Sequence, residues 1–134
     1  EGPYGRFDFS DPAPQQIWVG AGIGVTPFIA RMKHLAQQGG EHNVDFFHIT
    51  TEVDQAAIDK LSADAAAAGI RLHIRVSPRD GRLTPELIRS AVPNWQQASI
   101  WFCGPTPFGQ AIRADFVQQG LPAQRVHQEL FEMR

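Results

Sequence analysis

Three glycines at alternate positions, Gly20, Gly22 and Gly24, separate an apolar run from a segment with helical periodicity. The run 17–19 reads as a buried strand, and Thr26 opens the helix. Glycine lets the backbone turn sharply and approach a ligand closely, and the first turn of a helix presents N–H groups of partial positive charge. Binding of a phosphate group is the chemistry that suits such a turn.

The turn alone does not decide between two interpretations. A G-x-G-x-x-G fingerprint requires glycine where Val25 stands. The alternative to a phosphate site is a glycine-rich turn that only lets the helix pack closely on a sheet. In both cases Thr26 is predicted to cap the helix and Pro27 to take its first position, where the missing N–H loses no hydrogen bond.

Cys103 is the second candidate for chemistry, because it ends an apolar run and Gly104 and Pro105 follow it directly. A lone cysteine is either a small hydrophobic residue of the core or a thiol placed beside reacting atoms. One cysteine excludes a disulfide framework and a cysteine-ligated zinc or iron–sulfur cluster within the chain. The five histidines lack the spacing of metal ligands, so no metal site is predicted.

The elements that position these residues follow from apolar runs and helix signals. With 134 residues, 43% of them hydrophobic, the chain is long enough for one domain with its own core. Asp54 and Thr84 are predicted helix caps. The alternation of strands and helices predicts an α/β fold, an open five-stranded parallel sheet with helices on both faces. The predicted strands are residues 17–19, 43–51, 70–76, 99–103 and 125–131.

Composition excludes several classes of protein. Asp and Glu (14) outnumber Lys and Arg (12), which form no run, so no nucleic-acid partner is expected. No apolar run approaches the length of a membrane span, and no signal-peptide pattern is present. The chain starts with Glu1 rather than Met, so we expect a soluble piece of a longer protein.

In open parallel sheets, ligands bind at the carboxyl ends of the strands, where the strand order reverses. The segments 20–26, 77–82 and 104–108 follow predicted strands and should line that crevice together with the end of the last strand. Two of these segments are rich in glycine and proline, and the segment 77–82 is basic.

Five motifs, spread in order over nearly the whole chain, together resemble the nucleotide-binding domain of the ferredoxin–NADP reductase superfamily. They are Gly2-Pro3-Tyr4-Gly5 with Phe7, Gly20 to Pro27, Gly81-Arg82-Leu83-Thr84, Cys103-Gly104-Pro105, and His127 to Phe131. Residues 101–105 and the tail 131–134 look most similar to the ferric-reductase-like (NADPH oxidase-like) branch. In that branch a haem-bearing membrane domain precedes the flavin and nucleotide domains.

The resemblance implies a Rossmann-like sheet of order 3-2-1-4-5 that binds NADP or NAD in reduced form and delivers hydride to FAD. The FAD is held mainly by a barrel domain absent from this chain. Residues 1–15 would be the end of that domain and a linker, and residues 16–134 the NAD(P)-binding domain. The chain alone would bind nucleotide without turnover. Its parent would lie on the cytoplasmic side of a membrane and pass electrons through haem to ferric chelates or another acceptor.

The resemblance also assigns roles around the pyrophosphate and the nicotinamide. Gly20, Gly22, Ile23 and Gly24 would receive the pyrophosphate, and Thr26 would lie near the nicotinamide ribose or carboxamide. Cys103 would stand beside the nicotinamide C4. Pro27, Gly104, Pro105 and Phe108 complete this part of the predicted cofactor site.

For three further residues there are two interpretations, a role at the flavin and nicotinamide or a purely structural role. Glu129 would hydrogen-bond the carboxamide or relay a proton to the flavin, or else is a carboxylate at a strand end. Phe131 would cover the isoalloxazine ring, or is ordinary packing. Tyr4 would touch the flavin, unless it belongs to a disordered end.

The choice of NADPH over NADH depends on a partner for the 2′-phosphate. Ser77, Arg79 and Arg82 stand where NADPH-using relatives place a serine and two basic residues, and the alternative is a solvated basic turn. Glu52 is the competing candidate for an adenosine ribose, as in NAD enzymes. A different class of function is also open, a non-redox phosphate- or nucleotide-binding regulatory domain.

Overall fold

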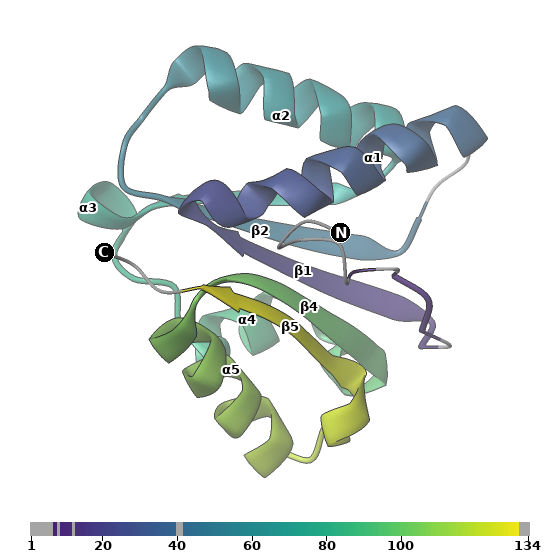
Figure 1. Cartoon of the computed structure of the whole chain (residues 1–134), viewed down its shortest axis with the longest axis vertical. Coiled ribbons are helices and arrows are strands. Elements are labelled where there is room, and N and C mark those ends of the chain that lie inside the picture. Colours follow the sequence, from purple (N-terminus) through teal and green to yellow (C-terminus); the bar gives the residue numbers. More distant parts are fainter. Residues whose placement is uncertain (1–6, 8, 12, 40–41, 132–134) are drawn as a thin grey trace.

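The computed structural model describes residues 7, 9–11, 13–39 and 42–131. Its centre is one five-stranded parallel sheet of order β3-β2-β1-β4-β5. The predicted fold class and strand order are therefore confirmed (Figure 1). The strands are β1 (Gln15–Ala21), β2 (Val44–Thr50), β3 (Arg71–Val76), β4 (Ala98–Pro105) and β5 (Val126–Phe131).

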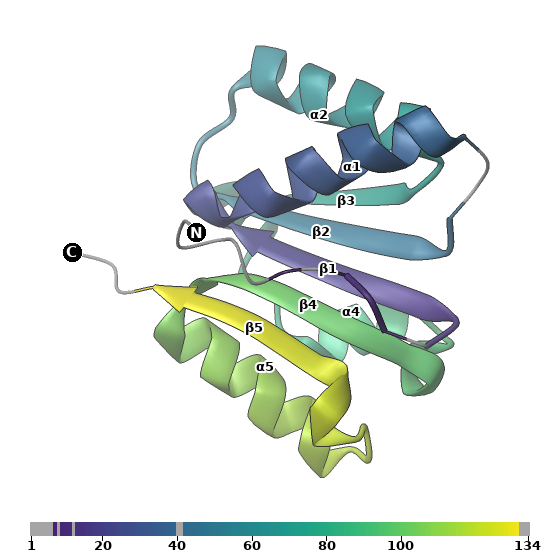
Figure 2. The ribbon, with the colours of Figure 1, turned by 45° about the vertical axis from the view of Figure 1, so that its right-hand side comes forward.

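Helices cover the sheet from both sides. α1 (Thr26–Gln38) and α2 (Gln55–Ala68) lie together on one face, and α4 (Pro85–Ala91) and α5 (Thr106–Gln118) lie on the other (Figures 1 and 2). A one-turn helix, α3 (Ser77–Asp80), follows β3. The short 3₁₀ segments are η1 (Gly22–Val25), η2 (Trp95–Gln97) and η3 (Ala123–Arg125).

Two hydrophobic cores lie on the two faces of the sheet because successive strand residues point to opposite sides. Trp18 of β1 packs in the core that includes Phe28 of α1, whereas its neighbour Val19 belongs to the core that includes Phe116 of α5. β1 and β4 are buried on both faces, which explains their nearly continuous apolar sequence.

The two predicted caps of α2 and α4 are confirmed. The Asp54 side chain accepts a hydrogen bond from the Ala57 N–H at 3.2 Å, and the Thr84 hydroxyl accepts one from the Leu87 N–H at 3.2 Å. Each satisfies a backbone donor in the first turn of a helix, which has no partner within the helix itself.

The predicted cap of α1 is wrong. The helix begins at Thr26 itself, so Pro27 occupies its second position, and the Thr26 hydroxyl donates to the Ile23 carbonyl at 3.2 Å. The reason is η1, which winds directly into α1 and leaves Val25 with a helical backbone where a cap residue is normally extended.

Phe7 and Phe9, which precede β1, pack on the face of β4 that α1 and α2 leave uncovered. The ring centroids of Phe7 and Phe9 lie 5.4 and 4.9 Å from that of Trp101. Asp11 contacts the imidazole of His127 on β5 at 2.7 Å. Phe9 is buried with a φ of 55°, a left-handed conformation that is uncommon outside glycine.

A buried carboxylate joins the amino ends of three strands. Asp45 of β2 accepts hydrogen bonds from Gln15 of β1 at 2.8 Å and from Arg71 of β3 at 2.9 Å, and contacts His73 at 2.8 Å. Burial raises the pKa of Asp45, but the bonds from His73 and Arg71 outweigh it and lower the pKa to about 2. The group is therefore ionised at neutral pH and ties β1, β2 and β3 together.

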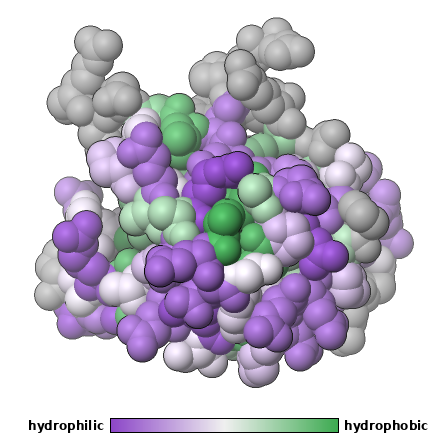
Figure 3. Space-filling model, turned by 90° about the horizontal axis from the view of Figure 1, so that it is seen from below, coloured by the Kyte–Doolittle hydropathy of each residue, from purple (hydrophilic) through white to green (hydrophobic). Residues whose placement is uncertain are grey.

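The face seen from the side of α5 is mostly hydrophilic around a small hydrophobic patch (Figure 3). Among the described residues, no helix has the length and apolar character needed to cross a bilayer.

Candidate functional site

The glycine-rich turn leaves the sheet at the point where the strand order reverses. β1 pairs with β2 on one side and with β4 on the other, and the chain reaches β4 only after completing β2 and β3. Loops from neighbouring strands diverge at such a point and leave a crevice at the carboxyl ends of the strands. η1 occupies the middle of this edge.

Gly24 fixes the turn against the end of β4. A Cβ at this position would lie 2.0 Å from the carbonyl oxygen of Cys103 and 2.7 Å from its carbonyl carbon. Contacts this short do not occur between real atoms, so only glycine permits the approach. The first predicted phosphate element and the cysteine are thus adjacent, as the resemblance implied.

The outer side of the same turn is open. Gly22 has a φ of 61°, and a Cβ built on it meets no atom within 4 Å. Ile23 is 66% exposed, and Thr26 is exposed as well. A turn with a left-handed glycine, no covering side chain among the described residues and a helix directly behind it has the shape and the partial positive charge that a pyrophosphate requires.

Cys103 pairs with Glu129 of β5 and with Gly20 of β1 in the sheet register, and the thiol is fully buried in the core on the α1 side. Burial raises the pKa of Cys103 to about 12, and the negative charge of Glu129 adds to the effect. The thiol is therefore neutral at physiological pH, which excludes a role as a thiolate nucleophile. Phe131 packs against the same core.

A second part of the edge is a hollow of about 280 Å³ between the segments that follow β3 and β4. It brings together four residues predicted for the cofactor site, Ser77, Arg82, Pro105 and Phe108. Sequence reasoning missed Ile49 and Leu83, which also line the hollow. Leu83 lies inside the Gly81-to-Thr84 motif, so the motif itself contained a signal for it.

Arg79 is placed differently from Arg82. Its Nε lies 3.0 Å from the Asp80 carboxylate, and it does not line the hollow with Ser77. Residues 77–82 were expected to form a charged turn, and the first four of them form the single helical turn α3. The cause is Asp80, whose carboxylate accepts the Val76 N–H at 2.9 Å, and Arg75, which donates to the Asp80 and Gly81 carbonyls. Arg79 and the Val76 N–H also lower the pKa of Asp80.

Tyr4 lies outside the described residues. The structure gives the positions of the other predicted site residues, and their roles toward a ligand stay predictions.

A parallel sheet of this order, with a glycine-rich turn on its central strand at the switch point, defines an α/β domain of the dinucleotide-binding class. No family model matches the sequence. Individual proteins do match, over nearly the whole chain.

An NADPH oxidoreductase of Mycobacterium tuberculosis is 35% identical over 133 residues, which cover 96% of this chain and 34% of that protein. The electron transfer component of toluate 1,2-dioxygenase from Pseudomonas putida is 28% identical over 138 residues, 97% of this chain and 41% of that protein. A crystal structure of the flavohem-like FAD/NAD binding domain of nitric oxide dioxygenase from Vibrio cholerae superposes with a TM-score of 0.78. It is 20% identical and covers 96% of this chain and 56% of that one.

The comparisons confirm the resemblance to the ferredoxin–NADP reductase superfamily, and the chain has the fold of the nucleotide-binding domain found in such proteins. It spans 34% and 41% of the lengths of the two relatives named above.

Proposed function

We propose that this chain is the NAD(P)H-binding part of a flavin-dependent reductase that passes a hydride from NAD(P)H to FAD for onward electron transfer. The observation that carries the proposal is the contact of Gly24 with the Cys103 carbonyl, with Glu129 next to Cys103 in the sheet. This contact joins the phosphate-binding turn and the end of β4 at one crevice. The names of the relatives, an oxidoreductase and an electron transfer component, support the same class of reaction.

In this proposal the protein positions the reactants, and the coenzyme supplies the hydride that FAD receives. The backbone of Gly22 and Gly24 binds the pyrophosphate, and Thr26 lies beside the nicotinamide end. Cys103, as a neutral thiol buried at the end of β4, lies behind the position of that ring. Glu129 is the group at this edge that can accept a hydrogen bond from the carboxamide or transfer a proton.

The open turn offers a clean test by calorimetric titration with NADPH, NADH and AMP. Gly22→Ala places a methyl group where the pyrophosphate should lie. We expect NADPH and NADH to bind this variant at least tenfold more weakly than the unsubstituted chain, because charge-assisted hydrogen bonds to phosphate contribute about 1.5–3 kcal/mol each. Gly39→Ala is the matched control, since Gly39 also has a positive φ and open surroundings but lies at the far end of α1. Equal losses in the two variants would contradict the proposed site. Binding of AMP with no preference for NAD(P)H would favour the non-redox regulatory alternative.

For coenzyme choice, we propose that Ser77 and Arg82 receive the 2′-phosphate of NADPH in the hollow they share, with Arg79 as an outer basic residue. Arg82→Ala should weaken NADPH binding about tenfold or more and spare NADH. Arg79→Ala should have a smaller effect, because its guanidinium already binds Asp80. If both coenzymes lose affinity equally in the Arg82 variant, the 2′-phosphate assignment is wrong.

The finer parts of the proposal concern the parent protein. We assign residues 1–15 to the end of a flavin-binding domain and a linker, and residues 16–134 to the nucleotide domain. The motif 101–105 supports the ferric-reductase-like branch, with a haem-bearing membrane domain, a location at the cytoplasmic face of a membrane and ferric chelates as acceptor. Absorption spectra of the purified full-length protein, recorded before and after addition of NADPH, test this assignment. A protein that contains flavin but no haem would refute the branch and leave the nucleotide-binding proposal intact.

A further inference from the structure

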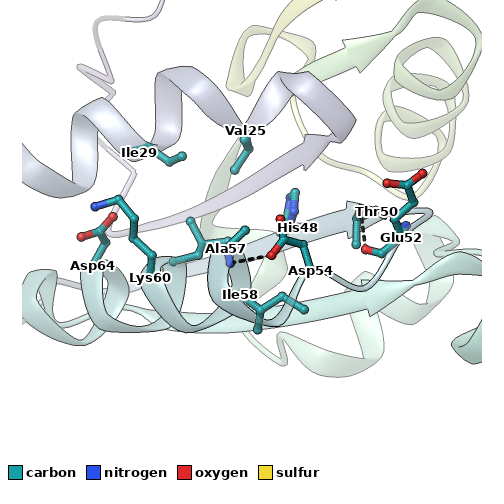
Figure 4. A pocket seen from close by; sticks show the side chains of 11 residues that line it. Val25, Ile29, His48, Thr50, Glu52, Asp54, Ala57, Ile58, Lys60 and Asp64 are labelled. Carbon is teal, nitrogen blue, oxygen red and sulfur yellow. Dashed lines mark hydrogen bonds between the residues drawn. The ribbon is translucent and has the colours of Figure 1, made fainter.

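A pocket of about 180 Å³ lies between α1 and α2, on the side of the sheet away from the hollow that holds Ser77 and Arg82 (Figure 4). The surface that faces the pocket is mostly apolar, although several polar side chains also contribute to the lining. Val25 and Ile29 point into it from the η1–α1 side, and Ala57, Ile58 and Leu61 line it from α2. An apolar cavity of about 150 Å³ is large enough to bind benzene, so this pocket has room for a small aromatic ring.

Two polar atoms buried in this lining have no hydrogen-bond partner among the described residues, Nδ1 of His48 and Oδ2 of Asp64. In Figure 4 Asp64 lies at one end of the pocket, whereas His48 lies toward the other end, on β2. An unpartnered buried carboxylate oxygen or ring nitrogen is unfavourable, and most such atoms in folded proteins are satisfied by protein, water or a ligand. The pocket therefore has an unsatisfied polar group toward each end of an apolar middle.

The charge of the lining favours a cation. Among the described lining residues, Glu52, Asp54 and Asp64 are acidic and Lys60 is basic. Burial lowers the pKa of His48, although a hydrogen bond to the Gly20 backbone acts in the opposite direction. His48 is therefore mainly neutral at pH 7 and does not offset the acidic groups. A phosphate or carboxylate ligand would be repelled here, which separates this pocket from the pyrophosphate turn.

We propose that the pocket binds a small organic amine whose ammonium donates to Asp64, whose apolar body fills the space between Ile29 and Leu61, and whose far end carries a hydroxyl that bonds His48. The ammonium supplies the donor that Oδ2 of Asp64 lacks. In a neutral imidazole one ring nitrogen accepts and the other donates, so the hydroxyl donates to Nδ1 of His48 in one tautomer and accepts from it in the other. This inference does not depend on the proposed redox function.

Tyramine is the probe that carries both end groups, and calorimetric titration of the chain at pH 7 without nucleotide tests the proposal. Phenethylamine lacks the hydroxyl and 4-ethylphenol lacks the ammonium. We expect 4-ethylphenol to bind about tenfold or more weakly than tyramine, because the bond to Asp64 is charge-assisted. Phenethylamine should bind a few-fold more weakly than tyramine, because it loses a neutral hydrogen bond.

Asp64→Asn should abolish the preference for tyramine over 4-ethylphenol and keep the preference over phenethylamine. Asp59→Asn is the matched control, because it makes the same substitution on α2 at a residue outside the pocket. The Asp59 carboxylate accepts a hydrogen bond from Gln55. Ala57→Phe should fill the pocket and abolish binding of all three compounds, with thermal melting to verify that the variant folds. The proposal is overturned if tyramine does not bind, if it binds no better than 4-ethylphenol, or if Asp64→Asn and Asp59→Asn behave alike.

Discussion

Replacement of Gly24 by alanine tests the contact that joins the turn to β4. The added Cβ would lie 2.0 Å from the Cys103 carbonyl oxygen, whereas real Cβ atoms keep at least 3.0 Å from such neighbours. The turn and the strand must therefore separate by about 1 Å or more, and both sides of the contact are backbone. Overpacking of this kind costs about 1–3 kcal/mol, or more where nothing flexible can yield. For a chain of 134 residues we expect a fall in melting temperature of roughly 5–12 °C.

The assay uses the lone cysteine of the chain. Cys103 is fully buried with a pKa of about 12, so its thiol should react very slowly with a disulfide reagent such as Ellman's reagent. In the Gly24→Ala variant the turn separates locally from the end of β4, and we expect the labelling of Cys103 to accelerate tenfold or more. Labelling through a local opening stays constant at low urea concentrations, whereas labelling through global unfolding rises with urea.

Gly39→Ala is again the control, because it strains a positive-φ glycine remote from Cys103. Its labelling rate should follow its global stability alone. A Gly24→Ala variant that melts within about 2 °C of the unsubstituted chain, with its thiol still protected, would show that the turn does not rest on β4 as described.

Three further predictions concern stability and rate. The pKa of Asp45 in the folded chain is lowered to about 2, so its contribution of about 2 kcal/mol to the free energy of unfolding is complete above pH 4 and is lost as the pH falls toward 2. Urea titrations at pH 5 and pH 2.5 should show this loss of stability. The Asp45→Asn variant should show a smaller loss. Cys103 has a raised pKa, so stability should decline by up to about 1.4 kcal/mol per pH unit between pH 9 and 12, and a Cys103→Ala variant, compared over the same range, should lack this component. In the full-length enzyme, Cys103→Ala should slow flavin reduction in stopped-flow measurements and leave nucleotide affinity nearly unchanged; an unchanged rate would remove Cys103 from the mechanism.

The segment before β1 gives a fifth prediction. Phe9→Ala should destabilise the chain by about 3 kcal/mol in urea unfolding, because it removes a buried ring packed on Trp18 and Trp101. A loss below about 1 kcal/mol would mean that this segment is a linker that contributes nothing to the core.

The parts of the fold that depend on local chemistry were predictable from the sequence. Apolar runs located all five strands, and the caps at Asp54 and Thr84 were recognisable because a capping bond spans only three residues. The order of the strands was not contained in those patterns. It came from the resemblance, since nothing local states which strand lies beside β1.

What the sequence could not supply depends on contacts between distant residues. The 3₁₀ winding that displaced the Thr26 cap accompanies the packing of Gly24 on Cys103, 79 residues later. The packing of Phe9 on Trp101 and the pocket bounded by His48 and Asp64 likewise require the sheet and helices to be in place. Arg79 and Arg82 look equivalent in sequence, and the helical turn α3 makes them different by pairing Arg79 with Asp80.

The contact between Gly24 and the Cys103 carbonyl also separates the candidate site into two parts that can be redesigned independently. Insertions or new side chains in the turn must be matched by changes in β4, because the two backbones touch. Arg82 and Ser77 lie on a separate, partly exposed surface and can be substituted without disturbing the contact between Gly24 and β4. Under the proposed 2′-phosphate assignment, engineering of coenzyme preference should therefore start from the segment after β3, with the turn after β1 left as it is.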